Sequence, residues 1–294
     1  MMDLQATPIV DMVSSLGESP VWDPRTERLY WIDYTEKKIN WYAPGTGNCS
    51  TFQLDVTPGC VAPTEQGDLL VGYEHEIGLF DMESEQLSTL FAPETGKDYN
   101  HFNDGKCDAA GRFWIGSITE TQDWPGAAFY RIDGKTGCEM VFDKVTTSNG
   151  LAWSPDNKTF YYIDTMTYCV AAFDFDLERG TLSGKRIVID FHQEAGRPDG
   201  MTIDEEGFLW IAHWNGGMIS RWNPHTGVCV MRIPVPAYNV TSCYFGGTAR
   251  DRLYVTSARV ETNEEKLRRY PLSGQTFVLR TGVAGLPTNF VKGM

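Results

Sequence analysis

Residues 197–217 read RPDGMTIDEEGFLWIAHWNGG and contain, in one piece, the plan that the rest of the chain repeats. Asp199 stands just before a short apolar run at 201–203, an acidic turn ends at Gly207, and a second run rich in bulky residues occupies 208–212. Apolar, β-branched and aromatic runs bounded by Gly and Asp are typical of strands joined by a turn. We interpret the stretch as two strands, with one carboxylate at the head of the first.

The same plan occurs six times along the chain. Each copy is a short apolar strand, a polar turn with Gly, Asp or Asn, and a second strand carrying aromatic and β-branched residues. The copies are 19–33, 60–73, 105–117, 150–164, 200–212 and 242–257. They recur roughly every 40 to 50 residues, the period of a propeller blade. Five of them are followed by a further pair of strands with a Gly-containing turn, which makes four strands per unit.

This repeat predicts an all-β fold, a six-bladed β-propeller with four antiparallel strands per blade. The alternative is a β-sandwich, which also has short strands between turns but no reason to repeat one plan six times. We expect a single domain over residues 1–294, with residues 1–16 closing the last blade. The tryptophans on these strands are expected to pack blade against blade: Trp22, Trp31, Trp41, Trp114, Trp153, Trp210 and Trp222.

Composition narrows the function class. The chain has 294 residues, is 41% hydrophobic and carries a formal net charge of −14 with a pI near 4.8. Nucleic acids and anionic membranes attract basic surfaces, so neither is an expected partner. The N-terminal sequence lacks the basic and apolar regions of a signal peptide, and a cytoplasmic location is expected. The chain has seven cysteines, an odd number, and no C-x-x-C pair, which argues against a disulfide framework or a thiolate zinc site.

Propeller geometry indicates where to search for chemistry. The first strand of every blade lines the central channel, so residues at the same end of these strands converge on the axis. The residues at or just before the six first strands are Glu18, Gly59 or Cys60, Asn103 with Asp104, Asn149, Asp199, and Ser242. Four blades thus offer carboxylate or amide oxygens, which favour calcium, magnesium or manganese over zinc.

Each of these positions also has a purely structural interpretation. The dipeptides Asn-Gly at 149–150 and Asp-Gly at 199–200, and the tripeptide at 103–105, are common turn sequences, and Glu18 could be a solvated loop acid. Their shared place before a first strand is what favours a site.

The chain resembles the SMP-30/gluconolactonase family, also called regucalcin-like. The resemblance covers the chain from about residue 17 to the C-terminus. It is carried by GESPVW at 17–22, FNDGK at 102–106, SNGL at 148–151, PDG at 198–200, NGG at 215–217 and CYFGG at 243–247. The resemblance implies one divalent metal on the axis, bound through Glu18, Asn149 and Asp199, and it places Asn103 near the metal or the substrate. Segment 259–274 is closer to bacterial sugar lactonases such as xylonolactonase and arabinolactonase.

Two departures from the family concern the substrate. Where many members have Arg before FND, this chain has His101, and an imidazole makes fewer hydrogen bonds than a guanidinium. Glu120 is an approximate match for a substrate-contacting Glu, with Thr121 as the competing alignment. We expect His101, Asn103 and Glu120 to bind substrate.

The expected activity is metal-dependent hydrolysis of a sugar lactone, an aldono-1,4- or 1,5-lactone, to the aldonic acid. Asp199 is the expected general base as well as a metal ligand; alternatively it only ligates the metal. Calcium is the first expectation for the metal, with magnesium, manganese, zinc and ferrous iron as alternatives. Two other functions stay open: a calcium-binding regulatory propeller without turnover, and a promiscuous esterase or phosphotriesterase. The partner is a small molecule, and the sequence leaves monomer or weak dimer undecided.

Overall fold

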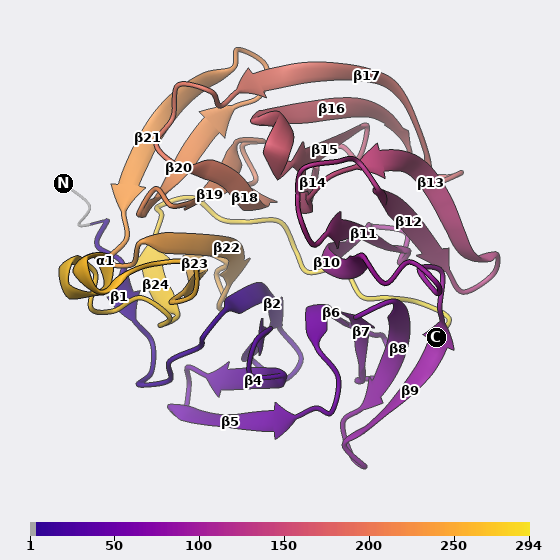
Figure 1. The fold of residues 1–294 in the computed structure, drawn as a ribbon, viewed down its shortest axis with the longest axis horizontal. Helices are drawn as coiled ribbons and strands as arrows, with labels where there is room; N and C mark the ends of the chain where they lie inside the picture. The colour runs from indigo at the N-terminus through magenta and orange to yellow at the C-terminus, as the bar shows by residue number, and fades with distance from the viewer. Residues whose placement is uncertain (1–3) are drawn as a thin grey trace.

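The computed structural model describes residues 4–294, and they form six four-stranded antiparallel sheets arranged around a central axis (Figure 1). The six-bladed β-propeller is confirmed. The first three blades are β2 (Gly17–Asp23), β3 (Arg28–Asp33), β4 (Lys38–Ala43), β5 (Asn48–Gln53); β6 (Pro58–Pro63), β7 (Leu69–Tyr73), β8 (Glu76–Asp81), β9 (Gln86–Phe91); and β10 (Asn100–Cys107), β11 (Phe113–Thr119), β12 (Ala127–Asp133), β13 (Gly137–Val145).

The next two blades follow the same order from the axis outward. They are β14 (Ser148–Trp153), β15 (Thr159–Asp164), β16 (Cys169–Asp176), β17 (Thr181–Asp190); and β18 (Arg197–Ile203), β19 (Leu209–Trp214), β20 (Met218–Asn223), β21 (Val228–Pro234). The 3-10 turn η1 (Thr165–Thr167) joins β15 to β16.

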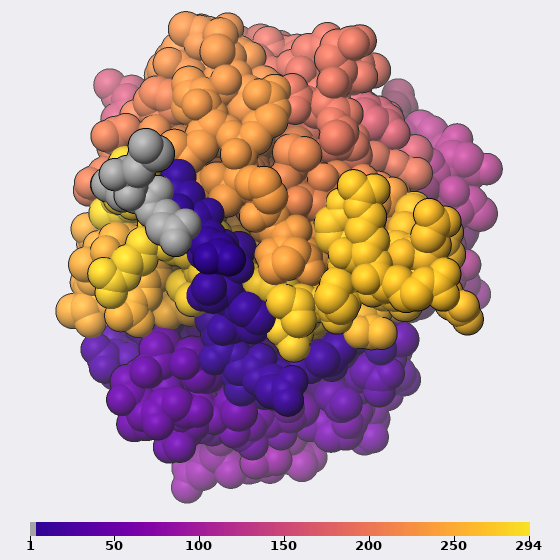
Figure 2. Space-filling view, turned by 90° about the vertical axis from the view of Figure 1, so that its left-hand side faces the viewer, coloured from indigo at the N-terminus to yellow at the C-terminus, as the bar shows by residue number. Residues whose placement is uncertain are grey.

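The last blade joins the two ends of the chain. It consists of β22 (Asn239–Gly246), β23 (Arg252–Ala258), β24 (Phe277–Arg280) and the N-terminal β1 (Thr7–Pro8). β1 pairs antiparallel with β24, so the N-terminal segment does close the last blade, although with only two residues. Figure 2 shows this indigo segment lying against the C-terminal half of the molecule. The helix α1 (Glu264–Arg269) lies between β23 and β24, and no helix of residues 4–294 is long and apolar enough to cross a membrane.

The hydrophobic core is divided into six clusters, each between two neighbouring blades. Trp31, Trp114 and Trp210 are fully buried in three of them. This arrangement explains why each blade repeats aromatic residues on its second strand: a blade is stabilised by the apolar faces of its neighbours. The expectation that tryptophans pack blade against blade is confirmed.

The C-terminal residues 281–294 cross the molecule instead of forming a further strand (Figure 1). The backbone of Glu205 donates to Ala284, Thr288 donates to the carbonyl of Trp22, and Val291 pairs with Pro63. Asn289 reaches the carbonyl of Cys107 in the third blade. This crossing segment therefore ties four blades to the end of the chain.

Glycines in the innermost strands set how closely neighbouring strands approach each other. A Cβ on Gly59 in β6 would lie 2.2 Å from the Phe102 carbonyl oxygen in β10, a backbone atom that cannot rotate away. We expect Gly59→Ala to lower the unfolding free energy by about 2–3 kcal/mol, as overpacking does. Chemical denaturation measures this change. Gly45→Ala, where the nearest atom would lie at 4.0 Å, is the control; equal stability of the two variants would contradict the close-approach argument.

Candidate metal and substrate site

A pocket of about 250 Å³ lies on the axis at one end of the innermost strands. Every residue predicted from the sequence as a ligand or substrate contact lines it: Glu18, His101, Asn103, Glu120, Asn149 and Asp199. They come from β2, β10, β14 and β18 and from the residue after β11. Thr121 is not among the lining residues, so of the two competing alignments it is Glu120 that reaches the pocket.

The innermost strands bring these side chains to the axis through irregular pairing. In β2 the register shifts between Glu18 and Val21, in β14 between Asn149 and Leu151, and corresponding shifts occur in β6, β10, β18 and β22. A bulge leaves a residue unpaired and redirects its side chain. The interpretation of Asn149-Gly150 and its counterparts as turns before the strands is therefore wrong: they lie inside the strands.

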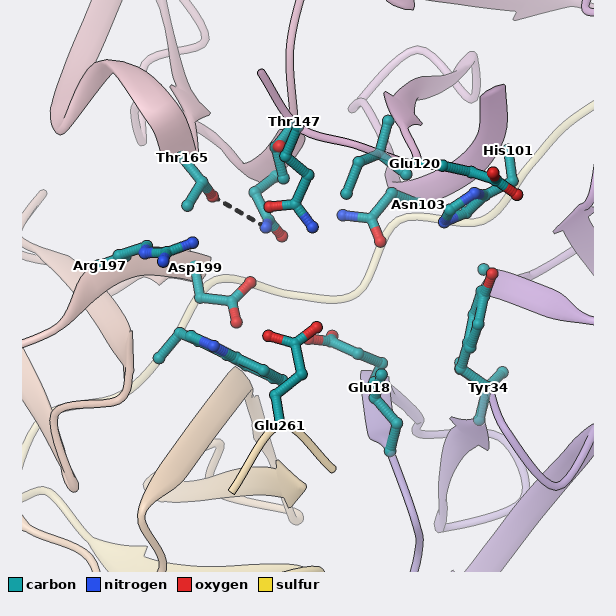
Figure 3. A pocket seen from close by; sticks show the side chains of 17 residues that line it. Glu18, Tyr34, His101, Asn103, Glu120, Thr147, Thr165, Arg197, Asp199 and Glu261 are labelled. Atoms are coloured by element: carbon teal, nitrogen blue, oxygen red, sulfur yellow. Dashed lines mark hydrogen bonds between the residues drawn. The ribbon is translucent and has the colours of Figure 1, made fainter. Parts of the chain in front are cut away.

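Two carboxylates in the pocket destabilise each other. Burial raises the pKa of Glu18 from 4.5 to about 8, and the nearby Asp104 carboxylate adds to the shift. Burial also raises the pKa of Asp199 well above its ordinary value, and the charges of Glu18 and Asp104 raise it further. Figure 3 shows the Glu18 and Asp199 side chains pointing toward the same part of the pocket. A cation between them would relieve both the repulsion and the desolvation.

The amides of Asn149 and Asn103 are oriented by hydrogen bonds to their nitrogens. Asn149 Nδ2 donates to Thr165 Oγ1 at 3.0 Å, and Thr165 Oγ1 in turn donates to the Pro198 carbonyl at 2.8 Å. Asn103 Nδ2 donates to the Ser148 carbonyl at 2.7 Å. Because the NH₂ groups of Asn149 and Asn103 are hydrogen-bonded to the pocket wall, their amide oxygens remain available to bind a metal or to accept a hydrogen bond from a substrate.

The residues present fit a hard divalent cation. Glu18, Asn149 and Asp199 offer two carboxylates and one amide oxygen, the donor type that calcium, magnesium and manganese prefer. Three protein ligands leave coordination positions for water or substrate. Burial raises the pKa of Asp104, and the charge of Lys106 opposes this shift.

Asp104 and Ser242, also expected near the axis, do not line this pocket. They lie further along the strands, at a smaller cavity of about 20 Å³ that also contains Lys106. The Lys106 ammonium donates to the Met201 carbonyl at 2.6 Å. The channel thus changes from oxygen donors at the pocket to a small cavity lined by both Asp104 and Lys106 deeper inside.

One wall of the pocket carries neutral hydrogen-bonding groups. His101 stacks at a tilt against Tyr34, with ring centroids 5.3 Å apart. Burial, with a smaller effect of His75, lowers the pKa of His101 from 6.5 to about 4, so the ring is uncharged near neutral pH. The pKa of Tyr34 is raised by burial and then by the charges of Glu120 and Glu74. This wall can both donate to and accept from the hydroxyls of a small molecule.

The sequence analysis missed several lining residues because it considered only the first strands. Trp214 ends a second strand, Tyr34 and Thr165 directly follow second strands, and all three line the pocket. Antiparallel pairing places the end of a second strand beside the start of the first, as in the pair Arg197 and Trp214, and this signal could have found them. Arg197, to which the sequence analysis gave no role, also lines the pocket (Figure 3). It is the first residue of β18, two residues before Asp199.

Known proteins resemble this chain over nearly its whole length. Residues 16–259 match the family model described as SMP-30/Gluconolactonase/LRE-like region. Regucalcin of Danio rerio is 36% identical over 290 residues, covering 98% of both chains. The structure of a luciferin-regenerating enzyme superposes with a TM-score of 0.90 at 29% identity and covers 95% of this chain and 96% of that one. The structure of a calcium-binding protein, regucalcin, from Agrobacterium tumefaciens superposes with a TM-score of 0.91 at 25% identity, covering 98% of each chain.

Proposed function

This chain belongs to the SMP-30/gluconolactonase/LRE-like family, and from that premise we propose that it is a metal-dependent lactonase. It opens a sugar lactone, an aldono-1,4- or 1,5-lactone, to the aldonic acid. The observation that carries the proposal is the meeting of Glu18, Asn149 and Asp199 in one pocket whose opposite wall carries neutral hydrogen-bonding groups. The narrower similarity to bacterial sugar lactonases stays a prediction, since the relative quoted above is an animal regucalcin.

Glu18, Asn149 and Asp199 would hold the metal, with calcium proposed first because the Agrobacterium relative is described as calcium-binding. When bound, the ion would polarise the lactone carbonyl and stabilise the negative charge that develops on its oxygen. Asp199 accepts the proton of the attacking water through its second carboxylate oxygen. As the ring C–O bond breaks, this proton passes to the released alkoxide, which becomes the new hydroxyl.

The remaining pocket residues bind the hydroxyl groups of the lactone. The Asn103 amide oxygen accepts a hydrogen bond, and the neutral His101 ring donates through one nitrogen and accepts through the other. Glu120 accepts from hydroxyls near the mouth of the pocket. Because these groups are neutral or acceptors, a polyol is the substrate class that they match.

A pH-indicator assay over a panel of aldonolactones tests this function. The protein is stripped of metal, and calcium, magnesium, manganese, zinc or ferrous iron is then added back singly. We expect at least one lactone to be opened faster than its spontaneous rate, and only with metal. Calcium binding without turnover of any lactone would favour the regulatory alternative. Turnover of an aryl ester or phosphotriester alone would favour the promiscuous esterase.

Replacing His101 by Gln is expected to raise KM about 3- to 10-fold and leave kcat nearly unchanged, because one hydrogen bond contributes about 0.5–1.5 kcal/mol. The pKa of about 4 also means that His101 is neutral at pH 5.5 to 8, so the variant should keep the wild-type pH profile across that range. Steady-state kinetics at several pH values measure both. His225→Gln, at an exposed position, is the control. If the wild-type rate changes with an apparent pKa near 6.5 and this change is absent in His101→Gln, the neutral state of His101 is contradicted.

A further inference from the structure

A second group of metal-ligating side chains lies on the fourth blade, outside the pocket. Cys169 begins β16, Asp190 ends β17, and the two are directly paired across these strands. His192 follows two residues later. One candidate ligand atom from each of the three lies within 4.8 Å of the others. None of the three lines the axial pocket.

The register of the blade places this group on the same face as the mouth of the pocket. Ser148 of β14 pairs with Asp164 of β15, Asp164 pairs with Cys169, and Cys169 pairs with Asp190. These four residues form one row from the axis to the outer strand. The group therefore lies at the rim, separated from the axial ligand Asn149 by the width of the sheet.

The backbone and the ring of His192 are already held in position. The His192 N–H donates to Asp190 Oδ1 at 3.0 Å, and Nδ1 lies 2.7 Å from the same oxygen. The Tyr168 ring stacks on the imidazole with centroids 5.4 Å apart and an interplanar angle of 29°. The Phe191 N–H donates to the Tyr168 carbonyl at 2.8 Å, which ties the two segments together. The segment that carries His192 is therefore ordered before an ion binds.

We propose that Cys169, Asp190 and His192 form a second metal site, selective for zinc or a similar borderline divalent ion over calcium. Their donors are one thiolate, one imidazole nitrogen and one carboxylate oxygen, a set suited to zinc. Ligand atoms around tetrahedral zinc are about 3.4–3.8 Å apart, given metal–ligand distances of about 2.0–2.3 Å. Shifts of about 1 Å in the exposed side chains of Asp190 and His192 close the difference from 4.8 Å.

Access and charge agree with this assignment. The His192 side chain is 57% exposed and that of Asp190 is 73% exposed, so an ion reaches them from solvent without any opening of the fold. Calcium, which prefers six to eight oxygens, finds only one carboxylate here. The axial site offers only oxygen ligands, whereas the rim site offers sulfur, nitrogen and oxygen. We therefore expect hard ions such as calcium at the axial site and borderline ions such as zinc at the rim site.

Cobalt titration of the full-length protein in excess calcium tests the site. The excess calcium is there to occupy the proposed axial site, so that cobalt reports on the rim site. Co²⁺ bound by a thiolate gives a near-ultraviolet charge-transfer absorption that oxygen ligands do not give. We expect this band to appear with one equivalent and to be displaced by zinc. It should be lost in Cys169→Ser, and the cobalt affinity should fall at least about tenfold in His192→Asn.

Cys49→Ser, which removes an exposed thiol on β5, is the matched control and should keep the band. Unchanged thermal midpoints would show that all four variants, Asp190→Asn included, are folded. A band that persists in Cys169→Ser, or that never forms in the wild type, would overturn the proposal. So would an affinity unchanged in both His192→Asn and Asp190→Asn.

Discussion

Replacing Asp199 by Asn is expected to lower kcat for lactone hydrolysis by about 10³-fold at saturating metal, the middle of the range for loss of a general base. The amide cannot accept the water proton, and it also contributes no charge to the metal. Initial rates over a metal titration separate the two effects. If high metal concentrations restore kcat, Asp199 acts only as a ligand; if the metal binds but kcat stays low, it is the base.

In the absence of metal, the same substitution is expected to raise the stability of the protein. Asp199 is buried beside the carboxylates of Glu18 and Asp104, so in the metal-free protein it must either carry an unfavourable charge or take up a proton. The neutral amide of asparagine avoids both costs. We expect metal-free Asp199→Asn to unfold at a higher temperature than the metal-free wild type, while added calcium stabilises the wild type more. Asp55→Asn, the same change at an exposed loop position, should alter neither. A less stable metal-free variant would contradict the electrostatic account of the pocket.

The fold could be predicted because its information is repeated. Most all-β folds have no use for six copies of one strand–turn–strand plan. The buried Trp114 and Trp210, for example, are both the second residue of the second strand in their blades. The crossing of residues 281–294 could not be predicted this way. That segment belongs to no repeat, and it is held largely by backbone hydrogen bonds, to which its side chains give no pattern.

The sequence could place the residues of the candidate site in one pocket because propeller topology brings residues that are far apart in sequence together at the axis. What the sequence left undetermined was the local geometry: Asn-Gly favours a hairpin turn and a bulge alike, and only the pairing register distinguishes them. The same limit applies to Cys169 and Asp190. They are 21 residues apart in sequence, and nothing short of the register of β16 and β17 shows that they face each other.

Metal-free protein is expected to lose stability as the pH rises from about 4.5 to about 8, whereas calcium-loaded protein is not. The pKa of Glu18 is raised from 4.5 to about 8 in the folded state, and those of Asp199 and Asp104 are also raised. Between these values the folded state keeps protons that the unfolded state has released. The associated stability is therefore complete below the unfolded pKa and is lost as the pH passes through the folded pKa.

The effect of Glu18 alone is on the order of 3 kcal/mol, taking about 1.4 kcal/mol for each tenfold change in proton affinity and allowing for the partial exposure of this side chain. Calcium at a hundred times its Kd adds about 2.7 kcal/mol. Because it binds deprotonated carboxylates, this gain grows with pH. Urea denaturation at pH 5 to 9, with chelator or with calcium, measures both slopes. Glu18→Gln should flatten the chelator series, and parallel slopes with and without calcium would show that these carboxylates do not form the metal site.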